Sequence, residues 1–211
     1  MSRGGGVGAL AGPNITEPPD ADGASFHPTP EGWLRATPSD ETLAWARRME
    51  AEGDKTKPND MRNFSKRRYQ GFVGERAFDV WLRSLSVTHE WHGQTDAKPD
   101  FELGAVSVGL KSCGSKRAWR PDLVVNVYER HREHPLRELF FAGFEHPGAV
   151  KQDRPTVVLL GGLPTETYFE LATFVSKGEQ LNPKVIAEND VWNLRTSKLE
   201  APQVWLERVL R

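Results

Sequence analysis

The segment at 98–112 constrains the fold of this chain more than any other part of the sequence. Between Ala105 and Lys111, aliphatic residues alternate with Ala, Ser and Gly, so one face is apolar and the other stays small until the lysine. A period of two is the pattern of a β-strand with one buried face. The segment therefore predicts a strand at 105–113, whose Lys111 faces a space open to a phosphate group or a hydrated metal ion.

Two acidic residues accompany this strand as candidate site residues. Asp100 lies just before it, across an expected turn, and can reach the same space. Glu75 lies upstream at 69–82, where apolar residues recur at helical spacing and flank the carboxylate. An acid beside an apolar stripe is a candidate for a functional role. Asp100, Glu75 and Lys111 are thus expected to converge from one helix and a neighbouring β-hairpin.

The other apolar runs predict a mixed α/β fold. Strands are expected where short runs rich in Val, Phe, Trp and Leu are bounded by Gly, Pro or Asn, near 88–91, 101–103, 105–113, 123–128, 139–144, 156–160 and 190–194. Helices are expected at 39–53, 69–82, 164–175 and 202–210. Gly161-Gly162 is expected to end the strand before it in a turn that leads into the next helix. This order indicates an α/β class with a central mixed β-sheet flanked by helices.

Residues 1–38 differ from the rest of the chain in composition, with seven Gly, six Pro and few large apolar side chains. Such a composition does not offset the entropy of ordering the chain, so a flexible leader is expected there. The remainder is expected to be one domain at 39–211, with a helical lead-in at 39–64 and a core at 65–211. The leader offers a docking segment for a homo-oligomer or a larger assembly.

The sequence also excludes several classes of protein. No run approaches the ~18 consecutive apolar residues that cross a bilayer, and 1–12 lacks the hydrophobic region of a signal peptide, so a cytoplasmic protein without membrane contact is expected. Cys113 is the only cysteine, which excludes an internal disulfide and a multi-cysteine zinc site. The spaced histidine pairs at 89 and 92 and at 131 and 134 are therefore interpreted as surface histidines rather than metal ligands.

Charge is unevenly distributed, although the net charge is only −1. The segment 55–137 has 16 Lys and Arg residues against 10 Asp and Glu residues. A basic segment is typical of a surface that binds a polyanion, and it is also typical of ordinary solvated helix faces. Two cationic clusters flank the candidate site in sequence and are candidate contacts to nucleic-acid phosphates: Lys66, Arg67, Arg68, Lys116, Arg117 and Arg120.

A helix carrying Gly-Phe-Val-Gly-Glu, then Pro-Asp, then a strand ending in Lys-Ser resembles the PD-(D/E)xK nuclease superfamily, which includes many restriction, repair and phage nucleases. The similarity covers about 69–127. It implies a restriction-endonuclease-like core in which Asp100 and Glu75 hold Mg²⁺ or Mn²⁺ and Lys111 orients or deprotonates the attacking water. The implied activity is metal-dependent hydrolysis of DNA phosphodiester bonds, as in a deoxyribonuclease of phage or bacterial type in the cytoplasm of a bacterium or a phage-infected host.

The sequence departs from this pattern at Gly109, where the family has Asp or Glu two residues before the lysine. Glycine offers no side-chain ligand, so the site lacks one carboxylate unless another acid substitutes. Asp79, one helical turn after Glu75, and Glu102, on the same side of a strand as Asp100, are the two candidate substitutes. Two functions therefore stay open: a nuclease of weakened or conditional activity, and a catalytically silent nuclease-like protein that binds DNA or serves in an assembly.

Overall fold

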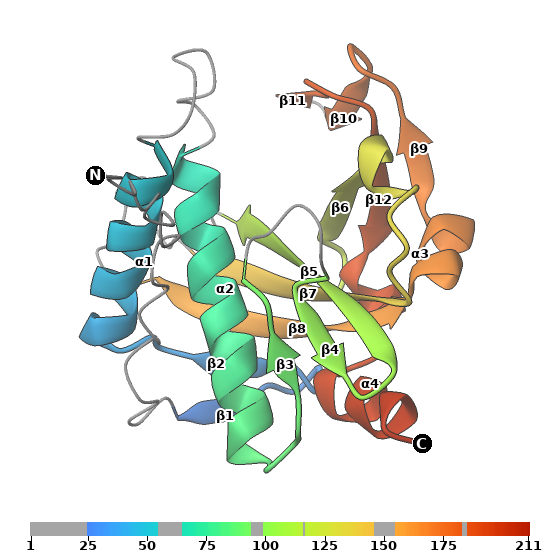
Figure 1. The fold of residues 1–211 in the computed structure, drawn as a ribbon. Helices are drawn as coiled ribbons and strands as arrows, with labels where there is room; N and C mark the ends of the chain where they lie inside the picture. The colour runs from blue at the N-terminus through green and yellow to red at the C-terminus, as the bar shows by residue number, and fades with distance from the viewer. Residues whose placement is uncertain (1–24, 55–64, 94–98, 116, 146–154, 183–184) are drawn as a thin grey trace, which may run out of the picture.

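The computed structural model describes residues 25–54, 65–93, 99–115, 117–145, 155–182 and 185–211 (Figure 1). The helices and 3-10 turns are α1 (Asp40–Asp54), α2 (Ser65–Ser84), η2 (Glu129–His131), α3 (Thr165–Leu171), η3 (Thr196–Lys198) and α4 (Pro202–Val209). No helix in these ranges is both long and apolar enough to cross a membrane. The described chain is a mixed α/β fold built on one large sheet.

The large sheet has seven strands in the order β1-β2-β8-β7-β5-β4-β3. Its strands are β1 (Phe26–Pro28), β2 (Leu34–Ala36), β3 (Glu90–Trp91), β4 (Phe101–Leu103), β5 (Val106–Ser115), β7 (Glu138–Glu145) and β8 (Thr156–Pro164). Only β5 and β7 run parallel, and every other neighbouring pair is antiparallel. The sheet is therefore mixed, as the sequence predicts, and β4 and β5 form the expected hairpin.

A smaller sheet packs against one face of the large sheet, and α1 and α2 cover the opposite face. It has three antiparallel strands, β6 (Val124–Tyr128), β12 (Val191–Arg195) and β9 (Thr173–Val175), in that order. The two-residue and three-residue strands β11 (Val185–Ile186) and β10 (Gln180–Asn182) pair separately. Because β6 and η2 form the crossover between the parallel strands β5 and β7, residues just after β6 lie close to the sheet face that carries Lys111.

Strand alternation divides the core into two clusters, one on each face of the large sheet. On the face covered by α1 and α2, the cluster includes Phe78, Phe101, Leu110 and Phe140. Phe78 lies 4.9 Å from Phe101 and 4.6 Å from Phe140 between ring centroids, which is the spacing of favourable aromatic pairs. A second core cluster lies on the opposite face, against β6 and β12. It contains side chains adjacent in sequence to those of the first cluster, such as Phe141 beside Phe140. Side chains one residue apart on β5 therefore face different environments.

Helix α1 begins where the sequence predicts. The Ser39 side-chain oxygen accepts the backbone N–H of Thr42 at 3.1 Å, which satisfies one of the free N–H groups of the first turn. Helix α2 contains the predicted segment 69–82, and its residues 72, 73, 77 and 78 are buried against the sheet. Both predicted helices of the front half are therefore confirmed.

Three sequence-based expectations are wrong in detail. Residues 26–36, expected in the flexible leader, form β1 and β2, because Trp33 and Ala36 are each 3% exposed and supply apolar area there. Residues 1–24 of the leader lie outside the described residues. The helix expected at 164–175 ends at Leu171 and continues as β9. Finally, β8 runs through Gly161-Gly162 to Pro164 instead of ending before them.

The two glycines of β8 let another segment approach the strand closely. Gly161 has φ +109, and a Cβ there would lie well within 3.0 Å of the Glu200 carbonyl oxygen. Gly162 and Glu200 exchange two backbone hydrogen bonds of 3.1 Å, which anchor the chain just before α4. The two glycines therefore allow the Glu200 backbone to pack closely against β8, and they do not form a turn.

Candidate functional site

Asp100 and Lys111 lie beside each other on the β4–β5 hairpin. Phe101 pairs with Val108, so Asp100 lies next to the Lys111 end of β5, and its Oδ2 accepts the Leu110 backbone N–H at 2.7 Å. Burial raises the pKa of Asp100, and the positive charges of Lys111 and His134 together with the Leu110 hydrogen bond only partly oppose this rise. The hairpin therefore brings a half-buried carboxylate and a half-buried ammonium group near each other.

Two histidines that follow β6 lie near these two groups. The His131 and His134 ring centroids are 5.2 Å apart. Burial lowers the pKa of His131 to about 4, and the charges of Lys111, Arg130 and His134 act in the same direction. His131 is therefore neutral at pH 7. The interpretation as surface histidines fits the exposed His134 but not His131, which is half-buried. The sequence pattern gives no sign that these histidines approach Lys111. Only the crossover between β5 and β7 in the folded chain brings 131–134 near β5.

Gly109 is covered by Leu136. A Cβ on Gly109 would lie well within 3.0 Å of the Leu136 Cδ1 atom, closer than real Cβ atoms approach other side chains. Leu136 itself packs against the second core cluster. The place of the acid that the nuclease pattern expects is therefore filled by the end of a leucine side chain.

Asp79 does not substitute for the missing acid, because it belongs to an ionic network inside α2. It is fully buried, pairs with the buried Arg76, and accepts hydrogen bonds from Arg83 Nε at 2.9 Å and His89 Nε2 at 2.8 Å. Burial would raise the pKa of Asp79, but the hydrogen bonds from His89 and Arg83 and the charges of both arginines outweigh burial and lower this pKa. His89, expected at the surface, is likewise held inside this network.

Glu75 lies on a different face of the sheet from Lys111. Its Oε2 accepts the Trp91 Nε1–H at 3.0 Å, and Trp91 stacks on Phe101, which belongs to the cluster beneath α2. Lys111 follows Leu110, a member of that same cluster, so by alternation Lys111 faces the opposite side. The described contacts thus bring Asp100 to Lys111 and leave Glu75, which is 3% exposed, among the residues beneath the helix.

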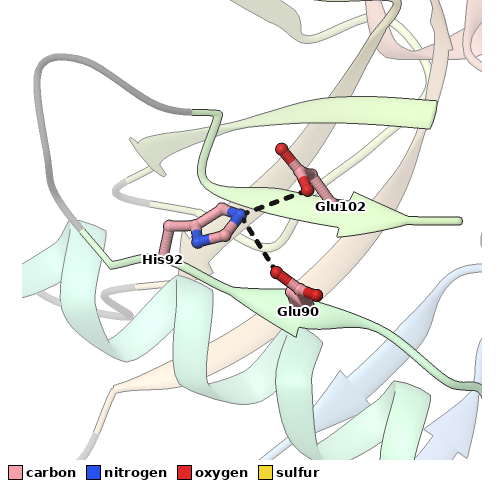
Figure 2. A group of neighbouring side chains, drawn as sticks. All are labelled: Glu90, His92 and Glu102. Atoms are coloured by element: carbon pink, nitrogen blue, oxygen red, sulfur yellow. Dashed lines mark ion pairs between the residues drawn. The ribbon is translucent and has the colours of Figure 1, made fainter. Parts of the chain in front are cut away.

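Glu102, the other proposed substitute, lies near a histidine instead of Lys111. Its Oε2 is 3.5 Å from His92 Nε2, and Glu90 Oε2 is 3.9 Å from the same nitrogen (Figure 2). In the described part of the chain, these three residues are the group whose possible ligand atoms lie close enough to share a metal ion. Glu90 has no sequence signal beyond its position on an edge strand, and the sequence-based interpretation missed it.

The predicted nucleic-acid contacts are only partly described. The side chains of Lys66, Arg67, Arg68 and Lys116 lie outside the described residues. Arg117 and Arg120 are both exposed, and Arg120 pairs with Asp122 at 2.9 Å. Trp119 between them is buried in the second core cluster. Both described arginines thus lie at the surface, and the buried Trp119 between them fixes the position of this segment.

The fold and the site define a mixed α/β protein with a half-buried carboxylate and a half-buried lysine near each other on the β4–β5 hairpin. No protein-family model, curated protein or solved structure matches the chain. The arrangement of Asp100, Lys111 and their neighbours is therefore the basis for a proposed function.

Proposed function

We propose that this chain is a metal-dependent nuclease of reduced metal affinity, which hydrolyses DNA phosphodiester bonds at Asp100 and Lys111. The observation that carries the proposal is that the β4–β5 hairpin places Asp100 within reach of the Lys111 charge. The order of a helix with Glu75, a strand preceded by Asp100 and a strand with Lys111 is also the order that the resemblance to PD-(D/E)xK nucleases predicts, which supports a restriction-endonuclease-like core.

The side chains around Lys111 fit a magnesium ion only in part. The described residues offer one carboxylate there, Asp100, and one of its oxygens already accepts the Leu110 N–H. Mg²⁺ in proteins commonly keeps several waters and takes one or two carboxylates plus substrate phosphates. Asp100 would therefore be the protein ligand of Mg²⁺ or Mn²⁺, with water and DNA supplying the others. We expect metal binding to be weak without DNA.

Lys111, His131 and the exposed arginines would each have a separate role in DNA binding or cleavage. Lys111 would contact a phosphate oxygen and stabilise the charge that develops on it during cleavage. His131, neutral at pH 7, lies beside Lys111 and could hold a hydrogen bond to the attacking water. When bound, the metal ion supplies Lewis acidity and a coordinated water. The exposed Arg117 and Arg120 would contact the DNA backbone away from Lys111.

A second candidate is a nuclease-like protein that binds DNA without cutting it. The observation in its favour is Leu136, which fills the place of the acid at Gly109. Both possible substitutes also lie in other contacts, Asp79 with arginines and Glu102 with His92. Lys111 could still contact one phosphate, and the exposed Arg117 and Arg120 would add further phosphate contacts, so DNA affinity would fall with rising salt.

Replacement of the lysine tests the proposal. Lys111→Ala is expected to lower the rate of Mg²⁺-dependent cleavage of duplex DNA by about 100-fold or more, because a charge that stabilises the transition state is lost. Lys198→Ala, an exposed lysine on η3, is the matched control and should cleave like the wild type. A wild-type protein that binds DNA in a salt-dependent, Lys111-dependent manner but never cuts supports the second candidate. Absence of both cleavage and binding rejects both.

Restoring the acid separates the two candidates further. In Gly109→Glu alone, the new side chain collides with Leu136, so the double variant with Leu136→Ala makes room for it. A second carboxylate beside Asp100 should strengthen Mg²⁺ binding and raise cleavage at least tenfold above that of Leu136→Ala alone. Cleavage that is equal in the two variants would show that the position of the family's acid has no role in this chain.

A further inference from the structure

We propose that Glu90, His92 and Glu102 form a zinc site at the free edge of the large sheet. Glu90 of β3 and Glu102 of β4 are direct cross-strand partners, and His92 follows β3 with its backbone N–H bonded to the Asp100 carbonyl at 3.1 Å. Figure 2 shows the three side chains pointing toward one another from the two strands. The site is separate from the side chains of Asp100 and Lys111 and does not rest on the proposed nuclease activity.

The distances around His92 Nε2 are close to those of ligands around a common ion. This nitrogen is 3.5 Å from Glu102 Oε2 and 3.9 Å from Glu90 Oε2. Hydrogen bonds between N and O are shorter, at about 2.7–3.2 Å. In a tetrahedral zinc site with bonds of about 2.0–2.2 Å, neighbouring ligand atoms lie roughly 3.3–3.6 Å apart. The Glu102 distance lies in this range, and the Glu90 distance exceeds it by a few tenths of an ångström. All three ligand atoms lie within 4.8 Å of one another, so a small rotation of the exposed Glu90 side chain would let one ion reach them together.

Burial gives a second and independent reason for an ion. The His92 side chain is only 11% exposed, and its Nε2 is a buried polar atom without a hydrogen-bond partner. Buried polar atoms in folded proteins are nearly always paired, so such an atom needs an explanation. Two carboxylates placed directly opposite each other on antiparallel strands also repel. One divalent cation would satisfy the nitrogen and neutralise both carboxylates.

The donor set selects zinc over magnesium. One imidazole nitrogen and two carboxylates are typical zinc ligands, whereas Mg²⁺ prefers oxygen ligands throughout. Glu90 and Glu102 keep side-chain exposures of 74% and 42%, so an ion can enter from solvent and retain a water as its fourth ligand. Because β3 is a two-residue edge strand, the ion would tie it to β4 and stabilise the stacking of Trp91 on Phe101.

Zinc binding to the full chain tests this proposal. After treatment with a chelator, titration calorimetry with ZnCl₂ is expected to give one Zn²⁺ per chain and a higher melting temperature, and an excess of MgCl₂ should not displace the ion. Glu90→Gln, His92→Gln and Glu102→Gln should each weaken Zn²⁺ binding at least tenfold. His27→Gln and Glu166→Gln, both exposed and distant in the fold, are the matched controls and should bind like the wild type.

Each outcome decides the matter. Absence of stoichiometric Zn²⁺ binding, or binding that all three variants leave unchanged, overturns the proposal. Glu90→Gln alters a side chain that is 74% exposed, so its effect on affinity cannot be attributed to misfolding, and circular dichroism would verify this. Co²⁺ in place of Zn²⁺ should give the visible bands of a tetrahedral site. No DNA cleavage enters these readouts, so this proposal and the proposed nuclease activity can fail independently.

Discussion

Gly161→Ala is expected to destabilise the folded chain by more than about 4 kcal/mol, which is exceptional for the addition of one methyl group. The new Cβ would overlap the backbone carbonyl oxygen of Glu200, and backbone atoms cannot swing aside as a side-chain end can. Gly161 also has φ +109, a conformation that alanine rarely adopts. Relief of the clash would break the two hydrogen bonds between Gly162 and Glu200 and release the segment that precedes α4.

The free energy of unfolding in urea, or the loss of native circular dichroism where the variant does not fold, measures this effect. Gly178→Ala is the matched control, since Gly178 has φ +91 but no atom within 4 Å of an added Cβ. Its cost should be that of the backbone conformation alone, about 1–2 kcal/mol. If the two variants cost the same, the close approach of Glu200 to β8 has no energetic weight.

Asp79→Asn is expected to destabilise the chain by about 3–5 kcal/mol, because it breaks a buried ion pair and removes a counter-charge of the buried Arg76 guanidinium. Arg76 is 1% exposed and Asp79 is fully buried, so water cannot replace the lost interaction. The hydrogen bonds that Asp79 accepts from Arg83 and His89 would also weaken. Since Asp79 ties three residues of α2 and the following loop together, its loss should loosen the C-terminal half of that helix.

Urea denaturation of Asp79→Asn beside Asp122→Asn checks this prediction. Asp122 also pairs with an arginine, but its side chain is 63% exposed, so its replacement should cost at most about 1 kcal/mol. The pKa of Asp79 is lowered on folding, so its stabilising effect is present above its ordinary value of 3.8 and is lost as pH falls through the folded pKa. The difference between wild type and Asp79→Asn should therefore be full at pH 7 and shrink in strong acid. A gap that is the same at both pH values would mean that the charge is not the cause.

The structure relates the two proposed sites to each other. Asp100 and Glu102 are two residues apart at the start of β4 and alternate onto the same side of the strand, while Phe101 between them is fully buried on the other side. The Asp100 carboxylate lies near Lys111, and the Glu102 carboxylate lies near His92. A single short strand thus contributes one acid to Lys111 and one acid to the group of Glu90 and His92. Because the two acids lie on the same side of the strand, the sequence alone suggests that they share one metal ion.

The sequence by itself determined the local elements and the hairpin. The alternation at 105–113 and the helical spacing at 69–82 identify β5 and α2, because backbone periodicity decides which neighbouring side chains share a face. The same reasoning predicted the hairpin that carries Asp100 and Lys111, since the register of a hairpin follows from its short turn. These conclusions depend on residues close together in the chain.

Only the tertiary structure decided which distant residues meet. The sheet places Glu75 and Lys111 on opposite faces, Leu136 fills the space at Gly109, and the Glu200 backbone closes on Gly161. His92 meets Glu102 because β3 pairs with β4 in one register out of several that the sequence allows. The physical reason is common to all four: periodicity assigns a residue to a face of its own strand or helix, but the packing of the whole chain chooses what stands opposite that face.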